Sequence, residues 1–340
     1  MCFFKNMTKK TYIVLDLEWN QSPDGKEYSV PGIPFEIIEL GAYKLNENHE
    51  IIDSFHRVIR PVVYKKIHFK VHEVGHIGIH ELRKLGVPFA QAAEEFFDWC
   101  GLLKKQENPV VFCTWGNMDL TEFQRNMKYH LVENTFPYPL LYYDIQKLYN
   151  LLYPDPLQDR YPLEKAVEKQ KLTMDRGFHH ALDDAYYTAK IMKSIDFSQV
   201  GEYLSLDYYT LPKNEEEELY LDFPGYSKYV SMLFASKEEI IENKTVTDIV
   251  CNCCHRMLKK KIRWFSSNQR NYFGLGICPQ HGYVRGKIRI RSREGRYFVI
   301  KTMKGVDERA YEELLEKKED YKQKRNERNR QKKIRTGDGL

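Results

Sequence analysis

The order of apolar and polar residues predicts alternating strands and helices over the first 200 positions of the chain. Short apolar runs that are typical of covered strands occur at 11–19, 35–46, 51–61, 109–115 and 139–145. Apolar residues at helical spacing occur at 89–103, 120–131 and 180–195. Strands that first form a group and then alternate with helices indicate an α/β fold, with a mixed sheet flanked by helices.

The sequence changes character after residue 198. The segment 199–245 is rich in acidic residues and interrupted by proline, which is typical of a linker. Cysteine, basic and aromatic residues dominate 246–305, where alternation around the turn "SREG" predicts a β-hairpin. The end of the chain, 306–340, is polar, as in a solvated helix or a disordered tail. We therefore expect a first domain at 8–198, a linker, a small β domain and a basic tail.

The charge is divided unevenly between the two parts of the chain. Residues 1–250 hold 28 Lys and Arg against 38 Asp and Glu, whereas residues 251–340 hold 25 against 10. The acidic part suits divalent cations, and the basic part suits a polyanion. No uncharged apolar segment approaches the roughly 18 residues of a membrane span, and the N-terminus lacks the pattern of a signal peptide. We expect a cytoplasmic protein.

Two carboxylates interrupt the apolar strand at 11–19. Asp16 and Glu18 are two positions apart, so in a strand they point to the same face. Two like charges beside a core are unfavourable unless a positive partner lies between them. An Asp-x-Glu pair in a strand is by itself more often a strand-end or edge feature than a metal site, so the pair raises the question of which positive partner it has.

Further carboxylates stand at the starts of two predicted helices. Asp119 follows an apolar strand, and Asp183 and Asp184 lie in the first turn of the last predicted helix. Each is also typical of ordinary helix capping, because acidic residues are favoured at a helix N-terminus. The ordered set, with His179 five positions before Asp184, is what points beyond capping.

This set resembles the DEDDh exonucleases, which include ribonuclease T, oligoribonuclease and the proofreading subunit of bacterial DNA polymerase III. The resemblance rests on "DLE" at 16–18, on Asp119 and on "HHALDDA" at 179–185. It covers roughly residues 10–195, and some similar exonucleases are known as inhibitors of a sporulation kinase pathway. It implies a ribonuclease H-like fold, with a mixed five-stranded sheet and helices around it.

The resemblance implies a metal-dependent 3′→5′ exonuclease that hydrolyses phosphodiester bonds of single-stranded nucleic acid. Two Mg²⁺ or Mn²⁺ ions would be bound by the four carboxylates, Asp16, Glu18, Asp119 and Asp184. His179 would be the general base, and Asp183 would lie outside the ligand set. We favour RNA over DNA because the sequence shows no polymerase or clamp-binding signal. The alternative is a non-enzymatic nucleic-acid-binding or regulatory protein on an exonuclease fold.

The cysteines predict a second, different metal site. Cys-x₂-Cys is followed by a gap of 23 residues and by Cys-x₂-His, a combination typical of structural Zn²⁺. The predicted ligands are Cys251, Cys254, Cys278 and His281. Cys253 and His255 remain open as alternative ligands. The small β domain is therefore expected to be zinc-ribbon-like.

Basic and aromatic residues are interleaved in this small domain. Residues 256–301 hold thirteen Lys and Arg and one acidic residue, a composition that fits single-stranded nucleic acid. The alternative is that the aromatic rings form the core and the charges solvate it. The candidate nucleic-acid contacts are Trp19, Arg289, Arg291, Lys322 and Arg325. Trp19 replaces a small residue of several relatives, and its ring either stacks on a base or packs in the core.

Overall fold

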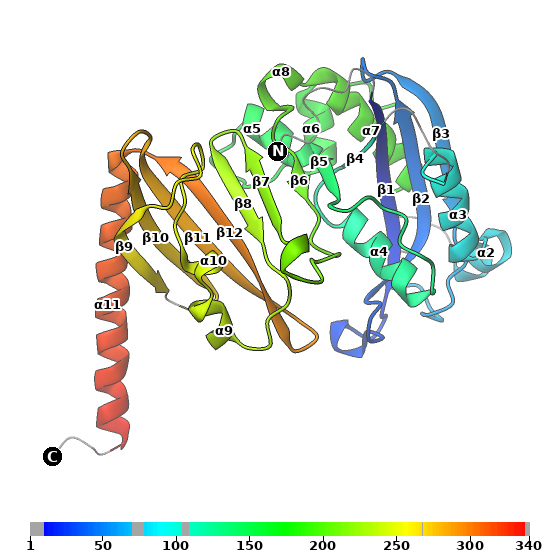
Figure 1. Ribbon diagram of the computed structural model, residues 1–340. Helices are drawn as coiled ribbons and strands as arrows, with labels where there is room; N and C mark the ends of the chain where they lie inside the picture. The colour runs from blue at the N-terminus through cyan, green and yellow to red at the C-terminus, as the bar shows by residue number, and fades with distance from the viewer. Residues whose placement is uncertain (1–9, 70–77, 104–108, 267, 337–340) are drawn as a thin grey trace. The chain divides into compact units, whose positions relative to one another are not determined.

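The computed structural model describes residues 10–69, 78–103, 109–266 and 268–336 of the chain. The chain divides into two compact units (Figure 1). The N-terminal unit ends at Thr210, and the C-terminal unit begins at Leu211. Residues 8, 9 and 337–340 of the expected domains lie outside the described residues.

A mixed sheet of six strands forms the centre of the N-terminal unit, in the order β3-β2-β1-β4-β5-β6. The strands are β1 (Thr11–Gln21), β2 (Phe35–Leu45), β3 (Ile51–Val58), β4 (Val110–Thr114), β5 (Leu141–Asp144) and β6 (Ser205–Leu206). Strands β1, β4 and β5 are parallel, whereas β2 and β3 continue the sheet in antiparallel pairs. The expected ribonuclease H-like sheet is confirmed, with the two-residue strand β6 added at its edge.

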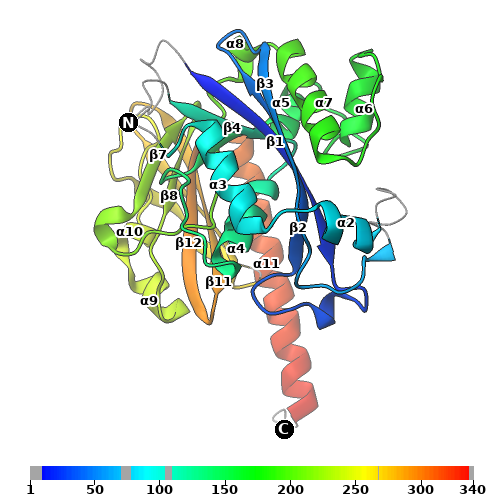
Figure 2. The same cartoon turned by 90° about the vertical axis from the view of Figure 1, so that its right-hand side faces the viewer.

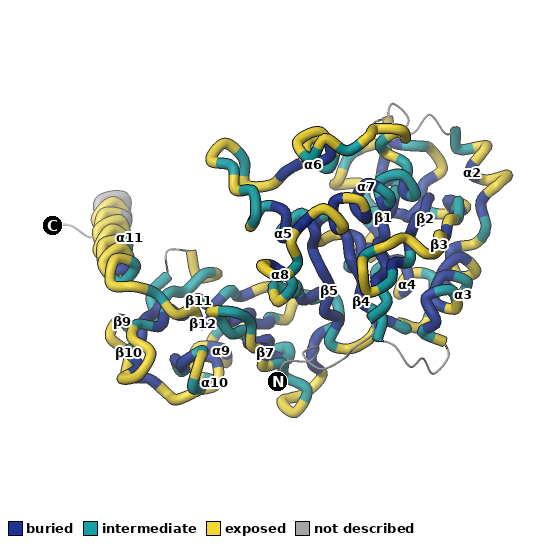
Figure 3. The backbone as a smooth tube through the Cα atoms, turned by 90° about the horizontal axis from the view of Figure 1, so that it is seen from above, coloured by how far each residue is buried: buried dark blue, intermediate teal, exposed yellow. Residues whose placement is uncertain are grey.

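Helices cover both faces of this sheet. They are α2 (Ile79–Leu85), α3 (Phe89–Cys100), α4 (Asp119–Tyr129), α5 (Ile145–Leu152), α6 (Leu163–Lys169), α7 (Ala181–Ser194), α8 (Phe197–Val200) and the 3₁₀ turn η1 (Lys26–Tyr28). Alternation along β1 sends Leu15 into a core with α3 and α4, and Val14 into a core with α5, α6 and α7. Figure 2 shows α3 and α7 on opposite sides of β1 and β2, and Figure 3 shows these central strands buried.

Gly41 on β2 allows α7 to lie unusually close to the sheet. It pairs with Asp16 across the β1–β2 ladder. A Cβ atom at this position would collide with the backbone of Ala181 and Leu182. Glycine therefore brings the first turn of α7 directly over the carboxylates of β1.

The C-terminal unit is built on a second, antiparallel sheet in the order β7-β8-β12-β11-β10-β9. Its strands are β7 (Leu219–Phe223), β8 (Tyr226–Val230), β9 (Lys259–Ser266), β10 (Asn271–Cys278), β11 (Gly282–Arg293) and β12 (Arg296–Val306). Its helices are η2 (Glu215–Glu217), α9 (Lys237–Glu242), α10 (Lys244–Thr247) and α11 (Glu308–Thr336). None of the described helices of either unit is both long and apolar enough to cross a membrane.

The segment 199–245 is folded, which corrects the expectation of a linker. Its first part completes the N-terminal unit through α8 and β6, and its second part supplies β7 and β8 to the C-terminal sheet. Leu221, Tyr229 and Val230 are buried there, although acidic residues surround them in the sequence. Of the two alternatives for the end of the chain, the described part is helical, because α11 spans Glu308–Thr336 and follows the end of β12 at Val306.

Candidate active site

The N-terminal unit gathers the four predicted carboxylates at one place. Asp16 and Glu18 lie on one face of β1, and Asp119 is the first residue of α4, directly after β4. Asp184 lies in the first turn of α7. The charges of Asp119, Asp184 and Glu18 each raise the pKa of Asp16, so the four carboxylates lie within electrostatic reach of one another. The shape of the sheet thus joins motifs that are far apart in the sequence.

Burial and mutual repulsion make these carboxyls reluctant to ionise. Burial raises the pKa of Asp16 well above its usual range, and the charges of Asp119, Asp184 and Glu18 raise it further. Burial and the neighbouring carboxylates raise the pKa of Glu18 to about 8. Burial also raises the pKa of Asp119 to about 7 and that of Asp184 to about 6. A cluster of this kind is stabilised by a divalent cation with a preference for oxygen ligands.

An unsatisfied oxygen supports the same interpretation. The Oδ1 atom of Asp184 is buried without a hydrogen-bond partner in the described part of the chain. Its other oxygen, Oδ2, accepts a hydrogen bond of 3.2 Å from the backbone N–H of His179. One ligand atom each of Glu18, His179 and Asp184 lies within 4.8 Å of the others. The residues present therefore fit a hard metal ion.

His179 and His180 occupy different environments. His179 has a left-handed backbone, with a φ of 67°, and its side chain is exposed beside the carboxylates. A non-glycine residue in this region is strained, and such strain concentrates at functional sites. His180 stands at the N-cap position of α7, and its Nδ1 is 3.8 Å from Oε2 of Glu39. The backbone thus directs the two neighbouring imidazoles to different partners.

Glu39 is a fifth carboxylate that the sequence analysis missed. It pairs with Glu18 across the β1–β2 ladder and is only 7% exposed. The pKa of Asp16 is raised mainly by burial and by the charges of the other three carboxylates, and the charge of Glu39 adds a smaller contribution. The Nε2 atom of His56 lies 2.8 Å from its Oε1. The signal that could have found it is the one used for Asp16, a carboxylate within an otherwise apolar strand.

The remaining acidic candidates have ordinary structural partners. Asp183 is engaged by Arg176, whose Nη1 lies 3.3 Å from its Oδ1. Asp144 caps α5 by accepting a hydrogen bond of 2.9 Å from the backbone N–H of Lys147. Asp119 is not an N-cap, since that position of α4 belongs to Met118. Capping therefore does not explain the position of Asp119.

The strand β1 also organises the surface beside the carboxylates. Trp19 follows a β-bulge, packs 5.5 Å from the ring of Phe35 and borders the first core, yet stays partly exposed. Asn20 is fully buried, and its side chain bonds the backbone at Lys66 and His68. A segment of the chain after β3 is thereby held near the end of the strand that carries Glu18.

The comparisons with known proteins address this unit. The sequence pattern of the exonuclease family matches residues 13–192, which is more than half of the chain. The chain belongs to the exonuclease family. This finding confirms the resemblance that the carboxylate motifs indicated. No curated protein matches the chain.

Several solved structures are similar to part of the chain. The nuclease domain of 3′hExo, a DEDDh family member bound to rAMP, is 22% identical, and the match covers 60% of this chain and 98% of that domain, with a TM-score of 0.48. Cell-death related nuclease 4 is 19% identical, with 58% and 66% covered and a TM-score of 0.47. Pop2p of S. pombe, in its Mg²⁺- and Mn²⁺-bound form, is 16% identical, with 58% and 90% covered and a TM-score of 0.40.

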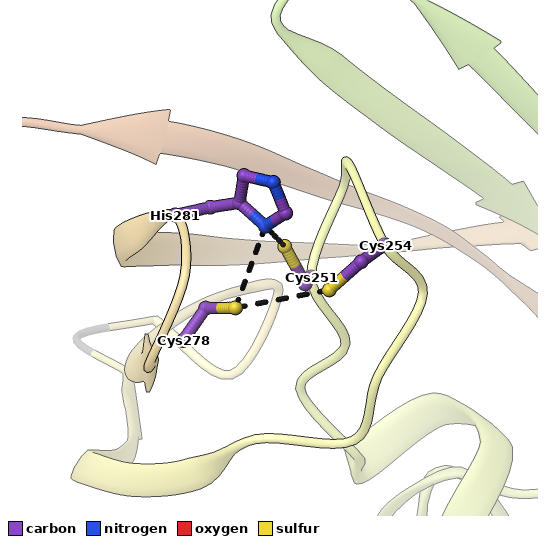
Figure 4. A group of neighbouring side chains, drawn as sticks. All are labelled: Cys251, Cys254, Cys278 and His281. Atoms are coloured by element: carbon purple, nitrogen blue, oxygen red, sulfur yellow. Dashed lines mark hydrogen bonds between the residues drawn. The ribbon is translucent and has the colours of Figure 1, made fainter.

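The cysteine cluster lies outside the part of this exonuclease that the family pattern matches. Figure 4 shows the four side chains facing one another, and their ligand atoms all lie within 4.8 Å. The Nδ1 atom of His281 is 3.5 Å from the sulfur of Cys251 and 3.5 Å from that of Cys278, which is 3.7 Å from the sulfur of Cys254. Three thiols and one imidazole in this arrangement fit a closed, four-ligand zinc site.

The two open alternatives lie outside this group. Cys253 is exposed and next to the cluster in sequence, but it is not among the four converging side chains. His255 lies 3.5 Å from a carboxylate oxygen of Asp222.

The thiol of Cys278 ionises more easily than an ordinary thiol. Burial raises its pKa, but hydrogen bonds from backbone N–H groups and from His281 outweigh burial and lower the pKa to about 6. This thiol is thus prepared to ionise, as a metal ligand must.

The proposed nucleic-acid contacts of the C-terminal unit are on the surface. Arg289 is partly exposed and Arg291 exposed on β11, while Lys322 and Arg325 are exposed on α11. The cysteine group packs against Val284, which lies on the other face of β11 from Arg289 and Arg291.

Proposed function

We propose that this exonuclease is metal-dependent and releases nucleotides from the 3′ end of single-stranded nucleic acid. The observation that carries the proposal is that Asp16, Glu18, Asp119 and Asp184 come together where β1 meets the first turn of α7, with pKa values raised by burial and by neighbouring carboxylates. Four like charges at one partly buried place are unfavourable for folding, which is typical of a functional site.

Asp16, Glu18, Asp119 and Asp184 would hold two Mg²⁺ or Mn²⁺ ions in this proposal. When bound, such ions supply charge neutralisation, activation of water and stabilisation of the leaving oxygen. The unsatisfied Oδ1 of Asp184 fits this ligand role. The protein itself fixes the positions of these oxygens, because each of the four side chains is attached to a strand or a helix, β1, α4 or α7, and not to a loop.

His179 is the proposed general base. One of its ring nitrogens would take the proton of the attacking water, because an imidazole titrates near neutral pH. Its exposure, its strained backbone and its hydrogen bond to Asp184 support a position at the edge of the site. Trp19 would stack on a terminal base with the exposed part of its ring, while the rest of the ring packs on Phe35.

A direct assay tests this proposal. Single-stranded RNA and DNA of one sequence, labelled at the 5′ end, are incubated with the protein in Mg²⁺, in Mn²⁺ and in EDTA. We expect a ladder that shortens from the 3′ end with either metal and no cleavage in EDTA, with RNA the better substrate. If neither strand is shortened with Mg²⁺ or Mn²⁺, the non-enzymatic alternative is correct.

The cysteine cluster has a structural role in this proposal. Cys251, Cys254, Cys278 and His281 would hold one Zn²⁺, and a closed set of four protein ligands leaves no position for a substrate. The bound ion would stabilise the small apolar cluster around Ile249 and Val284, to which two of the cysteines belong.

A further inference from the structure

One face of the C-terminal sheet carries a regular row of cations. Along β11, alternate residues are buried in apolar clusters, namely Val284, Ile288 and Ile290. The residues between them point to the opposite face, and we call Arg285, Lys287, Arg289 and Arg291 the β11 row. Alternate residues of a strand are about 6.6 Å apart, so the row sets positive charges at even intervals along one line.

The cations of the β11 row crowd one another. Burial lowers the pKa of Lys287, and the charges of Arg289, Lys317 and Arg285 lower it further. Cations held so close together are unfavourable in the free protein and become favourable when an anion lies across them.

Aromatic rings lie beside the row. Phe273 of β10 is directly opposite Lys287. Its ring centroid is 5.7 Å from the Nζ atom of Lys287 and 4.0 Å from that of Lys317. Phe265 of β9 follows at 6.1 Å from Phe273. Rings next to cations are the combination with which proteins bind single strands, because bases stack on rings while phosphates pair with the charges.

Helix α11 completes this surface. Leu314 packs with Ile262 and Leu275 of the sheet, and Tyr311 stacks on Tyr283 at 5.0 Å and an interplanar angle of 3°. These contacts place α11 along the outer strands of the sheet, with its C-terminal part extending past them (Figure 1). Lys317 is thereby brought from the helix to the side of the β11 row.

We propose that the β11 row, together with Lys317, binds the phosphate backbone of single-stranded nucleic acid, with the ring of Phe273 beside the bases. One guanidinium group can donate two parallel hydrogen bonds to the oxygens of one phosphate. Cations at even intervals along a line suit the regularly repeated phosphates of a nucleic-acid strand better than the irregular charges of an acidic protein. This surface goes beyond the proposed hydrolysis, because binding here requires none of the catalytic residues. Contacts to phosphates would make binding independent of sequence and strongly dependent on salt.

The test uses the full-length protein with its zinc, without Mg²⁺, and a labelled 20-nucleotide strand at several salt concentrations. The variant Arg289→Gln with Arg291→Gln is compared with the unchanged protein. The control is Lys237→Gln with Lys244→Gln, which removes two charges from α9 and α10, the helices that cover the other face through Ile240 and Val246. Single-strand contacts contribute a salt slope of about 0.7 per phosphate, so we expect the first variant to lose about 1.4 in slope and roughly tenfold in affinity at 0.15 M salt.

The control should bind as the unchanged protein does. Equal slopes for the unchanged protein and the Arg289→Gln, Arg291→Gln variant would overturn the proposal. So would a polyglutamate peptide that competes as well as an unlabelled strand, since the surface would then serve an acidic protein. Arg291→Gln alone, at an exposed position, gives the same test with half the effect if the double variant folds poorly. Cleavage of a very short oligonucleotide is measured separately, so that a failure of the proposed exonuclease activity is seen independently of binding.

Discussion

The carboxylate group and the cysteine group differ in what holds them in place. The carboxylates are attached to β1, α4 and α7, which are fixed by two large cores in which none of the four takes part. Cys251 and Cys278 are instead members of the small cluster that surrounds them, with Ile249, Leu258 and Val284. The carboxylate group is thus positioned by packing in which it takes no part, whereas the cysteines contribute to the packing around their own group.

The difference has an electrostatic side as well. The carboxylates repel one another within a finished fold, so a metal there relieves an unfavourable interaction that the core already tolerates. The cysteines belong to a much smaller group of buried residues than either core of the N-terminal unit, and a bound metal there would add a cross-link between segments of the chain. Metal removal should therefore abolish activity at one site and local structure at the other.

Zinc removal is expected to have the largest effect on structure. The protein purified without chelator should contain close to one Zn²⁺ per chain. Modification of the thiols should release it and expose the amides of residues 250–300 to hydrogen exchange, while the N-terminal unit stays protected. The expected loss is large because structural zinc binds with about 10 kcal/mol or more. Elemental analysis that finds no zinc would contradict this side of the comparison.

Asp16→Asn should remove the activity without removing the fold. The substitution keeps the shape of the side chain but takes a charged oxygen ligand from the site. We expect hydrolysis to fall by about 10³-fold or more, since metal ions contribute several kcal/mol to such reactions. Asp183→Asn is the matched control, because Asp183 lies beside Arg176 and should matter little. Residual activity above a few per cent for Asp16→Asn would show that Asp16 is not a ligand.

His179→Ala should have a smaller effect, on the chemical step. General acid–base catalysis contributes about 10²–10⁴-fold, so kcat should fall by that factor with little change in KM. The neighbouring substitution His180→Ala removes an imidazole that lies toward Glu39 and should reduce kcat less. A larger loss for His180→Ala would mean that the roles of the two histidines are reversed.

The residues that could be predicted are those whose signal is local. The five principal strands of the N-terminal unit and the order of its carboxylate motifs are visible as short patterns, because each motif stands at the end of a strand or at the start of a helix. Glu39 could not be placed by such a pattern alone. Its position opposite Glu18 depends on the β1–β2 register, which a bulge after Glu18 shifts.

The segment 199–245 shows the same limit in the C-terminal unit. Strands β7 and β8 are five residues each, and few of their side chains are buried. Strand β7 pairs with β8, and β8 pairs with β12, which follows about 70 residues later in the chain, at Arg296–Val306. The local composition shows the acidic residues around these strands but contains no information about the distant strand β12. The sequence analysis therefore predicted a linker where the chain is folded.

The smallest expected effect is a dependence of stability on pH in the protein without Mg²⁺. The pKa values of Glu18 and Asp119 are raised to about 8 and about 7, against ordinary values near 4 in an unfolded chain. Below about pH 4 both states hold the protons and the repulsion contributes nothing. Between pH 5 and 8 the unfolded chain has already lost the protons that the folded protein still retains, so the free energy of unfolding falls as the pH rises. Each kcal/mol lost should lower the Tm of a unit of this size by about 2–4 °C.

After dialysis against buffer without divalent ions, the Tm of the N-terminal unit should be lower at pH 8 than at pH 5, and Mg²⁺ should raise it more at pH 8. Asp16→Asn should flatten this dependence, because one of the repelling charges is gone. A Tm that stays constant or rises between pH 5 and 8 without metal would mean that the carboxylates are not held against their own repulsion.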